Sequence, residues 1–350
     1  IGAALTAISG SATQPALIQV FPGVYTEAVT MEAYVDIIST GGAEVTTIQQ
    51  TTSTVVTGAS NSRIAGFTIN KTTDDATPAI ELSTTSPTLK NLIITGAGTS
   101  DQIGVRITTG SPTINDIKID NVDVGITMEG TGGSPVIVDA RIGLSTQAVT
   151  GIRVTSTAGT MYVYNSVVSS TTDDVLVSGN GGTIVSHSNS LQSSTNNFEV
   201  DTGGTIESTN DRYALVDNDG TFIDLTDTRI YTENDDDIAV GEVVYVSAAS
   251  KVDEAKADAS STMPAIGIVV KESGTQLWVK TVGAYHQDAA AFTAGAKYYV
   301  SSATAGAITT TKPAGALSQV VAVAKSTEEL LLLPVTESEN SFQNTLTVSP

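Results

Sequence analysis

Two pairs of adjacent carboxylates are the first residues in this sequence with the chemistry of a catalytic site. Asp74/Asp75 and Asp173/Asp174 each follow a Thr-Thr dipeptide, and paired carboxyl groups carry out acid–base work at glycosidic bonds. Residues adjacent in an extended chain, however, point to opposite sides. Asp is also common in turns, because its side chain hydrogen-bonds nearby backbone groups. We therefore expect both pairs to lie in solvated turns at corners between strands.

The two histidines add little acid–base chemistry. His187, in "VSHSN", falls at a position that the repeat described below turns inward, where a solitary His is typically a hydrogen-bonded core residue. The repeat places no general-acid partner beside it. His286, in "AYHQD", lies between two C-terminal segments and is expected in a linker. The chain has no Cys, which excludes thiol chemistry, zinc–thiolate sites and iron–sulfur sites.

One stretch partly resembles a calcium-binding loop. "DNDGTFID" holds Asp217, Asp219 and Asp224, but Leu215 occupies the first Asp position of the pattern and Thr226 occupies the Glu position. The alternatives are a calcium site at these three aspartates and a plain Asp–Gly turn, and we favour the turn. The acidic run at 235–237 is expected to be a solvated loop. We expect no cofactor.

The net charge of the chain restricts the classes of partner that we expect it to bind. The sequence has 37 acidic and 16 basic residues, for a formal net charge of -21. Such a surface repels phosphate groups, so we expect neither nucleic acid nor a membrane as a partner. No apolar run reaches the roughly 18 residues that a membrane-spanning helix needs. The negative sign of the charge suits solubility, cation binding or a salty exterior.

An internal repeat reveals the elements that must position these residues. The phrase "SPTLKNLIIT" at 86–95 returns as "SPTINDIKID" at 111–120. Its equivalents recur at steps of 22 to 25 residues, at Pro87, Pro112, Pro135, Gly159, Gly182 and Gly204. The segments alternate like strands, and the leucine-rich repeat pattern is absent. The repeat predicts an all-β fold: a right-handed, single-stranded parallel β-helix over residues 1–213.

Alternation within the repeat predicts which residues face the inside of the coil. One inward column holds Leu89, Ile114, Ile137, Met161, Ile184 and Ile206. A second holds Leu92, Ile117, Ala140, Tyr164, His187 and Thr209, and a third holds Ile94, Ile119, Ile142, Ser166, Asn189 and Asp211. The last two become polar, which predicts that the helical core ends near Asp211; the alternative is that polar side chains form ladders inside the coil.

The C-terminal third contains a second duplication. "GEVVYVSAASK" is echoed by "GAKYYVSSATAG", and "AIGIVVKESGTQLWV" by "VVAVAKSTEELLLLP", at an offset of 54 to 55 residues. Each copy has the pattern of three or four short strands. We predict a connector at 214–237, one small β module at 238–284, a related module at 285–336 and a polar tail at 337–350.

Two family resemblances accompany these patterns. "IQVFPGVYTEAVTMEAYVDIISTGG" at 18–42, followed by the coils, resembles pectin-lyase-like right-handed β-helix proteins, and its "PGVYTE" resembles the first coils of pectinesterase-type chains. "MPAIGIVV", "AGAKYYVSS" and "AGALSQVVAVA" resemble β modules of bacteriophage virion proteins. Together the resemblances imply a phage fibre, tailspike or capsid appendage. The catalytic motifs of pectate lyases, polygalacturonases and pectinesterases are missing, so the resemblance implies no enzyme activity.

Outward columns form the natural ligand surface of a β-helix. We select Arg106, Lys118, Arg141, Arg153 and Tyr162 as a surface for a glycan or a protein partner, since basic groups are scarce in this chain and an aromatic ring can stack on a sugar. The alternative is ordinary ion pairing of the basic residues with Asp116 and Asp139 between coils. Outward apolar residues such as Ile93, Val138 and Leu176 favour a subunit contact.

These patterns favour a structural virion protein exposed on the particle surface. It would be a rigid scaffold, expected to be a homotrimer, that attaches to cell-surface polysaccharide or to other virion proteins. One alternative is a polysaccharide depolymerase of the tailspike type, which requires two carboxylates on adjacent coils. Another is a bacterial surface adhesin.

Overall fold

The computed structural model describes two compact units. It covers residues 1–98, 102–143, 148–155, 159–178, 181–193, 195–201, 203–212, 216–218, 221–234, 238–287, 290–313 and 317–333. The first unit is Ile1–Phe222 and the second is Ile223–Pro350. The fold is 54% strand and 4% helix, so the predicted all-β class is confirmed.

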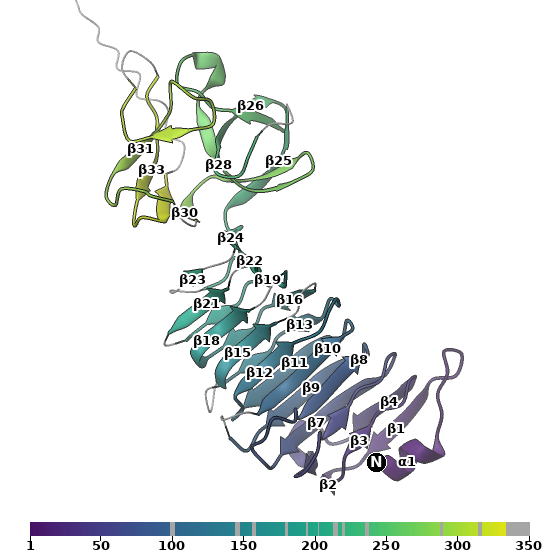
Figure 1. The fold of residues 1–350 in the computed structure, drawn as a ribbon. Coiled ribbons are helices and arrows are strands. Elements are labelled where there is room, and N and C mark those ends of the chain that lie inside the picture. Colours follow the sequence, from purple (N-terminus) through teal and green to yellow (C-terminus); the bar gives the residue numbers. More distant parts are fainter. Residues whose placement is uncertain are drawn as a thin grey trace, which may run out of the picture. The chain divides into compact units, whose positions relative to one another are not determined.

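The first unit is a parallel β-solenoid of about nine turns, seen in Figure 1 as stacked strands from β1 to β22. Its smaller sheet contains nine strands, one per turn: β3 (Val29–Thr30), β6 (Val56–Thr57), β8 (Ile80–Thr84), β10 (Ile103–Thr109), β12 (Val124–Met128), β15 (Ala148–Val154), β18 (Ser170–Val177), β21 (Asn196–Val200) and β23 (Val216–Asn218). A second set of inward residues follows the same register, at Ile80, Val105, Ile126, Ile152, Val175 and Phe198.

The larger sheet contains fifteen strands. Its main path is β1 (Ala16–Val20), β4 (Val35–Ser39), β7 (Arg63–Lys71), β9 (Thr88–Thr95), β11 (Thr113–Asp120), β13 (Val136–Val138), β16 (Thr160–Tyr164), β19 (Thr183–His187), β22 (Thr205–Thr209) and β24 (Thr221–Asp224). Short strands continue several turns: β2 (Gly23–Thr26), β5 (Thr46–Gln50), β14 (Arg141–Ile142), β17 (Val167–Val168) and β20 (Ser190–Leu191). Leu89, Ile114 and Ile137 stack as neighbours with no solvent exposure, as predicted.

A left-handed residue bends each turn of the larger sheet. Positive φ angles recur at equivalent places in successive turns, at Gly66, Asn91, Asp116, Asp139, Asn165, Ser188 and Asn210. Gly, Asn and Asp are the residues that adopt this conformation at the lowest cost. The bend divides the sheet into a first limb before this residue and a second limb after it, so the outward side chains of one turn face two directions.

The predicted register is wrong beyond Ile137. This residue pairs with Val163 rather than Met161, since the step to the next turn is 26 residues and not 24. Pro135 is therefore the equivalent of Met161, whose neighbour Tyr162 donates its N–H to the Pro135 carbonyl at 2.9 Å. The first inward column continues from Ile137 through Val163, Ser186 and Ser208. Ser166, Asn189 and Asp211, predicted to follow Ile142 in the third column, instead follow Ala140 in the second. The third column continues from Ile142 through Val168 and Leu191 and stays apolar. Tyr164, His187 and Thr209, predicted inward, face outward.

Polar side chains do form a ladder inside the last turns. Ser166 Oγ accepts the N–H of Ala140 at 3.1 Å, and Asn189 Oδ1 accepts the N–H of Ser166 at 2.7 Å. Asp211 Oδ1 accepts the N–H of Asn189 at 2.6 Å, and its other oxygen accepts the Ser208 hydroxyl at 2.8 Å. Burial raises the pKa of Asp211, against these hydrogen bonds. Each turn thus satisfies a buried N–H of the turn before it.

Apolar packing fills the remaining solenoid interior. One continuous core runs from Leu5 to Ile206. Leu5 lies on the short helix α1 (Gly2–Ala7) and is buried at the N-terminal end of this core. A single 3-10 turn, η1 (Ala43–Val45), lies between β4 and β5.

The second unit combines a barrel and a sheet, in agreement with the predicted β modules. The closed barrel contains β25 (Thr228–Glu233), β26 (Val243–Ala248), β27 (Lys251–Glu254), β28 (Ala265–Ser273) and β29 (Gln276–Lys280). The five-stranded sheet contains β30 (Gly283–His286), β31 (Lys297–Val300), β32 (Ile308–Thr309), β33 (Val320–Ala324) and β34 (Glu329–Leu332), and a 3-10 turn, η2 (Ser260–Thr262), precedes β28.

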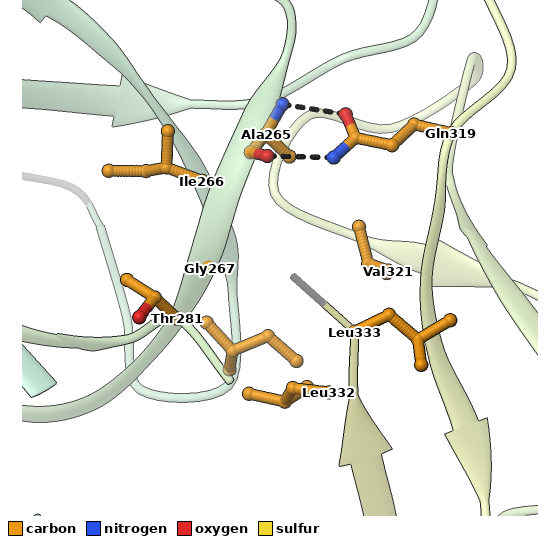
Figure 2. Close-up of a pocket in the computed structure, with 9 residues that line it drawn as sticks. Ala265, Ile266, Gly267, Thr281, Gln319, Val321, Leu332 and Leu333 are labelled. Atoms are coloured by element: carbon orange, nitrogen blue, oxygen red, sulfur yellow. Dashed lines mark hydrogen bonds between the residues drawn. The ribbon is translucent and has the colours of Figure 1, made fainter. Parts of the chain in front are cut away.

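The barrel and the sheet share one apolar core. Residues of the barrel such as Val243 and Ile268 pack with Val300 and Leu330 of the sheet. Figure 2 shows the Gln319 side chain beside β28, where its amide donates to the Ala265 carbonyl at 2.8 Å and accepts the Ala265 N–H at 2.9 Å. The Gln319 side chain thereby forms with the Ala265 backbone the two hydrogen bonds that a neighbouring strand would form with β28.

A matched pair of substitutions tests the stacked core. Ile114→Ala removes a fully buried side chain from β11, and we expect the free energy of unfolding to fall by about 2–5 kcal/mol. Its outward neighbour Asn115→Ala is the control, with an expected change within about 0.5 kcal/mol. Urea unfolding followed by far-UV circular dichroism measures both, and equal losses would contradict the assigned inside and outside of the coil.

Candidate functional site

Arg106 and Arg153 occupy one outward column of the smaller sheet, as predicted. They are separated by Thr127 of the intervening turn. Each is ion-paired with a glutamate: Arg106 with Glu81 at 2.6 Å and Arg153 with Glu129 at 3.4 Å. The expected alternative of ion pairing therefore holds for these two arginines, although the partners are glutamates rather than Asp116 and Asp139.

Lys118 and Arg141 lie on the second limb of the larger sheet. They are paired neighbours on β11 and β14, and Lys118 contacts Asp120 at 2.8 Å. The next residue of their column is Val167. Tyr162 lies on β16, in the first limb. The five selected residues thus occupy three different faces, and the structure does not bring them together in one site.

Tyr162 does belong to an aromatic cluster that the predicted register concealed. Its ring and that of Tyr164 are stacked, with centroids 6.5 Å apart and planes 8° from parallel. The His187 ring meets Tyr164 edge-on at 6.2 Å. His187 is half-buried on the outer face of β19, so its predicted inward position is wrong. We call Tyr162, Tyr164 and His187 the tyrosine face.

The surroundings of the tyrosine face are flat and mostly uncharged. Valines flank it on the neighbouring strands, with Val136 and Val138 paired to the two tyrosines on one side and Val185 paired to Tyr162 on the other. Stacked aromatic rings that expose part of their faces bind the apolar faces of flat or ring-shaped ligands. The "YVY" alternation in β16 already placed both tyrosines on the same side of the sheet, and this signal was available in the sequence.

The first carboxylate pair lies at a corner, as predicted. Asp74 is exposed between β7 and β8. Asp75 contacts the buried Lys71 at 2.9 Å. Burial opposes ionisation of Asp75, but hydrogen bonds from Thr77 and Lys71 outweigh it and hold its pKa below the usual value.

The second pair is buried in β18, so the prediction of solvated turns is wrong there. Asp174 is completely buried and takes the inward position that glycines occupy in the three preceding turns, at Gly104, Gly125 and Gly151. Its carboxylate accepts the N–H and hydroxyl of Ser170 at 3.0 Å each, the N–H of Ser193 at 2.6 Å and the Asn197 amide at 2.9 Å. Burial raises its pKa despite these donors.

Asp173 meets a second carboxyl group from the next turn. It is 5% exposed, and Glu199 lies on β21, the strand paired with β18. The Asn196 amide donates to both groups, at 3.3 Å to Asp173 and 2.9 Å to Glu199. Burial, followed by the hydrogen bond and repulsion from Glu199, raises the pKa of Asp173 to about 7. The two carboxyl groups meet on one amide donor, whereas glycoside hydrolysis needs carboxyl groups about 5 Å or more apart that flank the glycosidic bond.

The suggested calcium ligands are divided between described and undescribed residues. Asp217 belongs to β23, and Asp219 lies outside the described residues. The Asp224 carboxylate contacts the buried Lys280 at 3.0 Å, and Lys280 also donates to the Thr226 carbonyl at 2.7 Å. Across the described residues, no three His, Asp or Glu side chains are grouped to hold a metal ion.

Three other predictions concern loops and ends. His286 is in strand β30, paired with Glu329 of β34, and not in a linker as predicted. The acidic run at 235–237 and the polar tail at 337–350 lie outside the described residues. Within the described part of the chain, no helix has the length and apolar character needed to cross a bilayer.

No protein-family model matches the chain, and no curated protein matches it either. The parallel β-solenoid is therefore established by the structure alone, and the site rests on its geometry.

Two ion pairs of similar length test the environment of Asp224. Lys280→Met leaves a carboxylate that is 14% exposed without its cation, and we expect a loss of about 3–5 kcal/mol. Lys325→Met removes a 2.8 Å pair with Glu329 in which the lysine is 65% exposed, and we expect less than about 1 kcal/mol. Denaturant unfolding followed by the fluorescence of Trp278, the single Trp of the chain, measures both. A stable Lys280→Met protein would contradict the assigned buried pair.

Proposed function

We propose that this protein is a structural attachment protein, exposed on the surface of a bacteriophage particle as a fibre, tailspike or capsid decoration. The solenoid fold is compatible with proteins of this kind. Attachment to a neutral cell-surface glycan through the tyrosine face is the role that the geometry favours. The observation that carries this proposal is the stacked Tyr162–Tyr164 pair on the outer face of the sheet, flanked by Val136, Val138 and Val185.

Stiffness supports a scaffold role. Each strand in the middle of the solenoid pairs with the turn before and the turn after it, as β11 does with β9 and with β13 and β14. The core beneath is continuous. A bend within the solenoid would break backbone pairs and expose apolar columns together, so the rod holds its outward residues at fixed spacing.

The net charge of the chain favours a neutral glycan over an acidic one. With a formal net charge of -21, the chain repels acidic polysaccharides. The tyrosine face offers aromatic rings and valines, which stack on the apolar face of a neutral sugar ring. Thr209, paired with His187, supplies a hydroxyl at its edge for sugar hydroxyl groups.

Multivalency would make such a shallow contact effective. A single stacked ring contributes little affinity, but several copies held together raise the avidity by orders of magnitude. We propose a homotrimer for this reason. The half-buried outward side chains of Ile93, Val138 and Leu176 supply apolar surface for contacts between subunits or with other virion proteins.

The depolymerase alternative has one observation in its favour, which is the pair of carboxyl groups on adjacent turns. Asp173 and Glu199 both accept from the Asn196 amide, and Asp173 is 5% exposed, so this pair offers no open groove for a glycosidic bond. A bacterial surface adhesin would use the same tyrosine face. Detection of the protein in purified phage particles separates the virion role from the adhesin role.

Substitution of the two tyrosines tests the proposed binding face. Stacking contributes roughly 0.5–1.5 kcal/mol per ring, so Tyr162→Ala and Tyr164→Ala should each weaken binding to neutral polysaccharide by about 2- to 10-fold. Binding to immobilised neutral and acidic polysaccharides is measured by biolayer interferometry, together with an assay for new reducing ends.

Tyr299→Ala is the matched control, because Tyr299 is a half-buried strand tyrosine of the second unit. Unchanged binding of both solenoid variants would contradict the glycan role. A changed oligomeric mass with unchanged glycan affinity would identify the tyrosine face as a subunit contact. New reducing ends that disappear in Asp173→Asn would favour the depolymerase.

A further inference from the structure

The Asp173–Glu199 contact joins two consecutive turns of the solenoid. Asp173 lies in β18 and Glu199 lies in β21, and the two strands are paired in register. Two carboxyl groups can hydrogen-bond with each other only when a proton lies between them, because carboxylates are acceptors and have no donor of their own. Both carboxyl groups accept from one Asn196 amide, which brings them together at the β18–β21 pairing. A direct hydrogen bond between them would require one shared proton.

The Asn196 side chain contacts both carboxyl groups. Its amide nitrogen carries two hydrogens, and it donates to Asp173 Oδ1 at 3.3 Å and to Glu199 Oε2 at 2.9 Å. Both bonds hold the carboxyl groups side by side whatever their charge. When the shared proton is lost, two negative charges remain at hydrogen-bonding distance in a largely buried position, and they repel strongly.

The surrounding charges do not relieve that repulsion. Asp174, the next residue of β18, adds a further negative charge. Arg153 of β15 lies in the same outward column as Glu199 but two turns away, and it is ion-paired with Glu129. Thr150 of β15 and Asn196 of β21, which flank Asp173 in register, are uncharged. Asp217 pairs with Glu199 from β23, and its side chain lies outside the described part of the structure.

We propose that Asp173 and Glu199 form a proton-dependent latch between the β18 and β21 turns. The latch is closed when the two carboxyl groups share a proton, and it loosens when that proton is lost. The C-terminal turns of the solenoid are then held together more tightly in mildly acidic surroundings than in alkaline ones, while the turns before β15 have no such dependence on this pair.

The effect of pH on the stability of these turns follows from the difference between the pKa of Asp173 in the folded chain and in the unfolded chain. The pKa of Asp173 is raised from 3.8 to about 7 in the folded turn, so folding takes up a proton between these values. The stabilisation is complete at acid pH and is lost as the pH rises to about 7. Local opening of β18 and β21 should thus be about tenfold more frequent at about pH 8 than at about pH 6.

Hydrogen exchange measured by mass spectrometry on the whole chain tests the latch. Peptides covering β18 and β21 are compared at the two pH values after correction for intrinsic exchange, with peptides covering β9 as the internal reference. We expect the tenfold loss of protection in β18 and β21 and none in β9. Asp173→Asn, whose amide donates to Glu199 without a titrating proton, should abolish the difference, and Glu199→Gln should do the same from the other side.

Asp116→Asn is the matched control, because Asp116 is an exposed solenoid aspartate at a left-handed position that Asn also tolerates. It should retain the wild-type pH dependence. Equal protection of β18 and β21 at both pH values in the wild type would overturn the latch. So would a tenfold difference that survives in both Asp173→Asn and Glu199→Gln. If one of these variants does not fold, the other decides.

Discussion

In-register stacking of parallel strands is the constraint on which the rest of the solenoid depends. A single turn has an apolar side that it cannot bury and backbone groups that it cannot pair, and both needs are met only by the turns above and below. Leu89, Ile114 and Ile137 follow one another for this reason. The same register places every outward side chain beside its equivalents about 4.8 Å away, so surface features arise as columns and not as isolated residues.

The sequence was sufficient for the architecture and for the columns of its regular turns. It was insufficient where the turn length changes, because Pro or Gly before a strand is a preference and not a requirement of the backbone. The bend is the better marker, since a left-handed residue is needed once per turn and few residue types adopt it. Alignment on Asn91, Asp116, Asp139 and Asn165 gives the 26-residue step directly, and it turns Tyr164 and His187 outward.

The buried aspartates were missed for a different reason. A rule that assigns apolar residues to the inside cannot anticipate a carboxylate whose hydrogen-bond donors come from the next turn, as Ser193 and Asn197 do for Asp174. The space for that carboxylate is provided by an inward position held by glycine in earlier turns, where an added Cβ at Gly151 would lie 2.1 Å from Val168. The register between β15 and β18 also shifts just before Asp174, between the Ala148–Ser170 and Thr150–Asp173 pairs, and the sequence gives no sign of this shift.

The two ends of the solenoid stack in the same register but are stabilised by different interactions. Where the columns are apolar, from Ile64 to Ile142, each turn is held by packing that is insensitive to charge. From Ser166 onward two inward columns hold polar groups, while the column of Val168 and Leu191 stays apolar. Directed hydrogen bonds, such as that from the Asn189 N–H to Asp211, are there added to the apolar packing. Hydrogen bonds of buried carboxyl groups depend on protonation in a way that methyl contacts do not. The tyrosine face lies over the turns where this change occurs, since Tyr162 and Tyr164 flank the inward Val163 and His187 follows the inward Ser186. The tyrosine face therefore lies over a part of the core that contains both apolar side chains and hydrogen-bonded polar side chains.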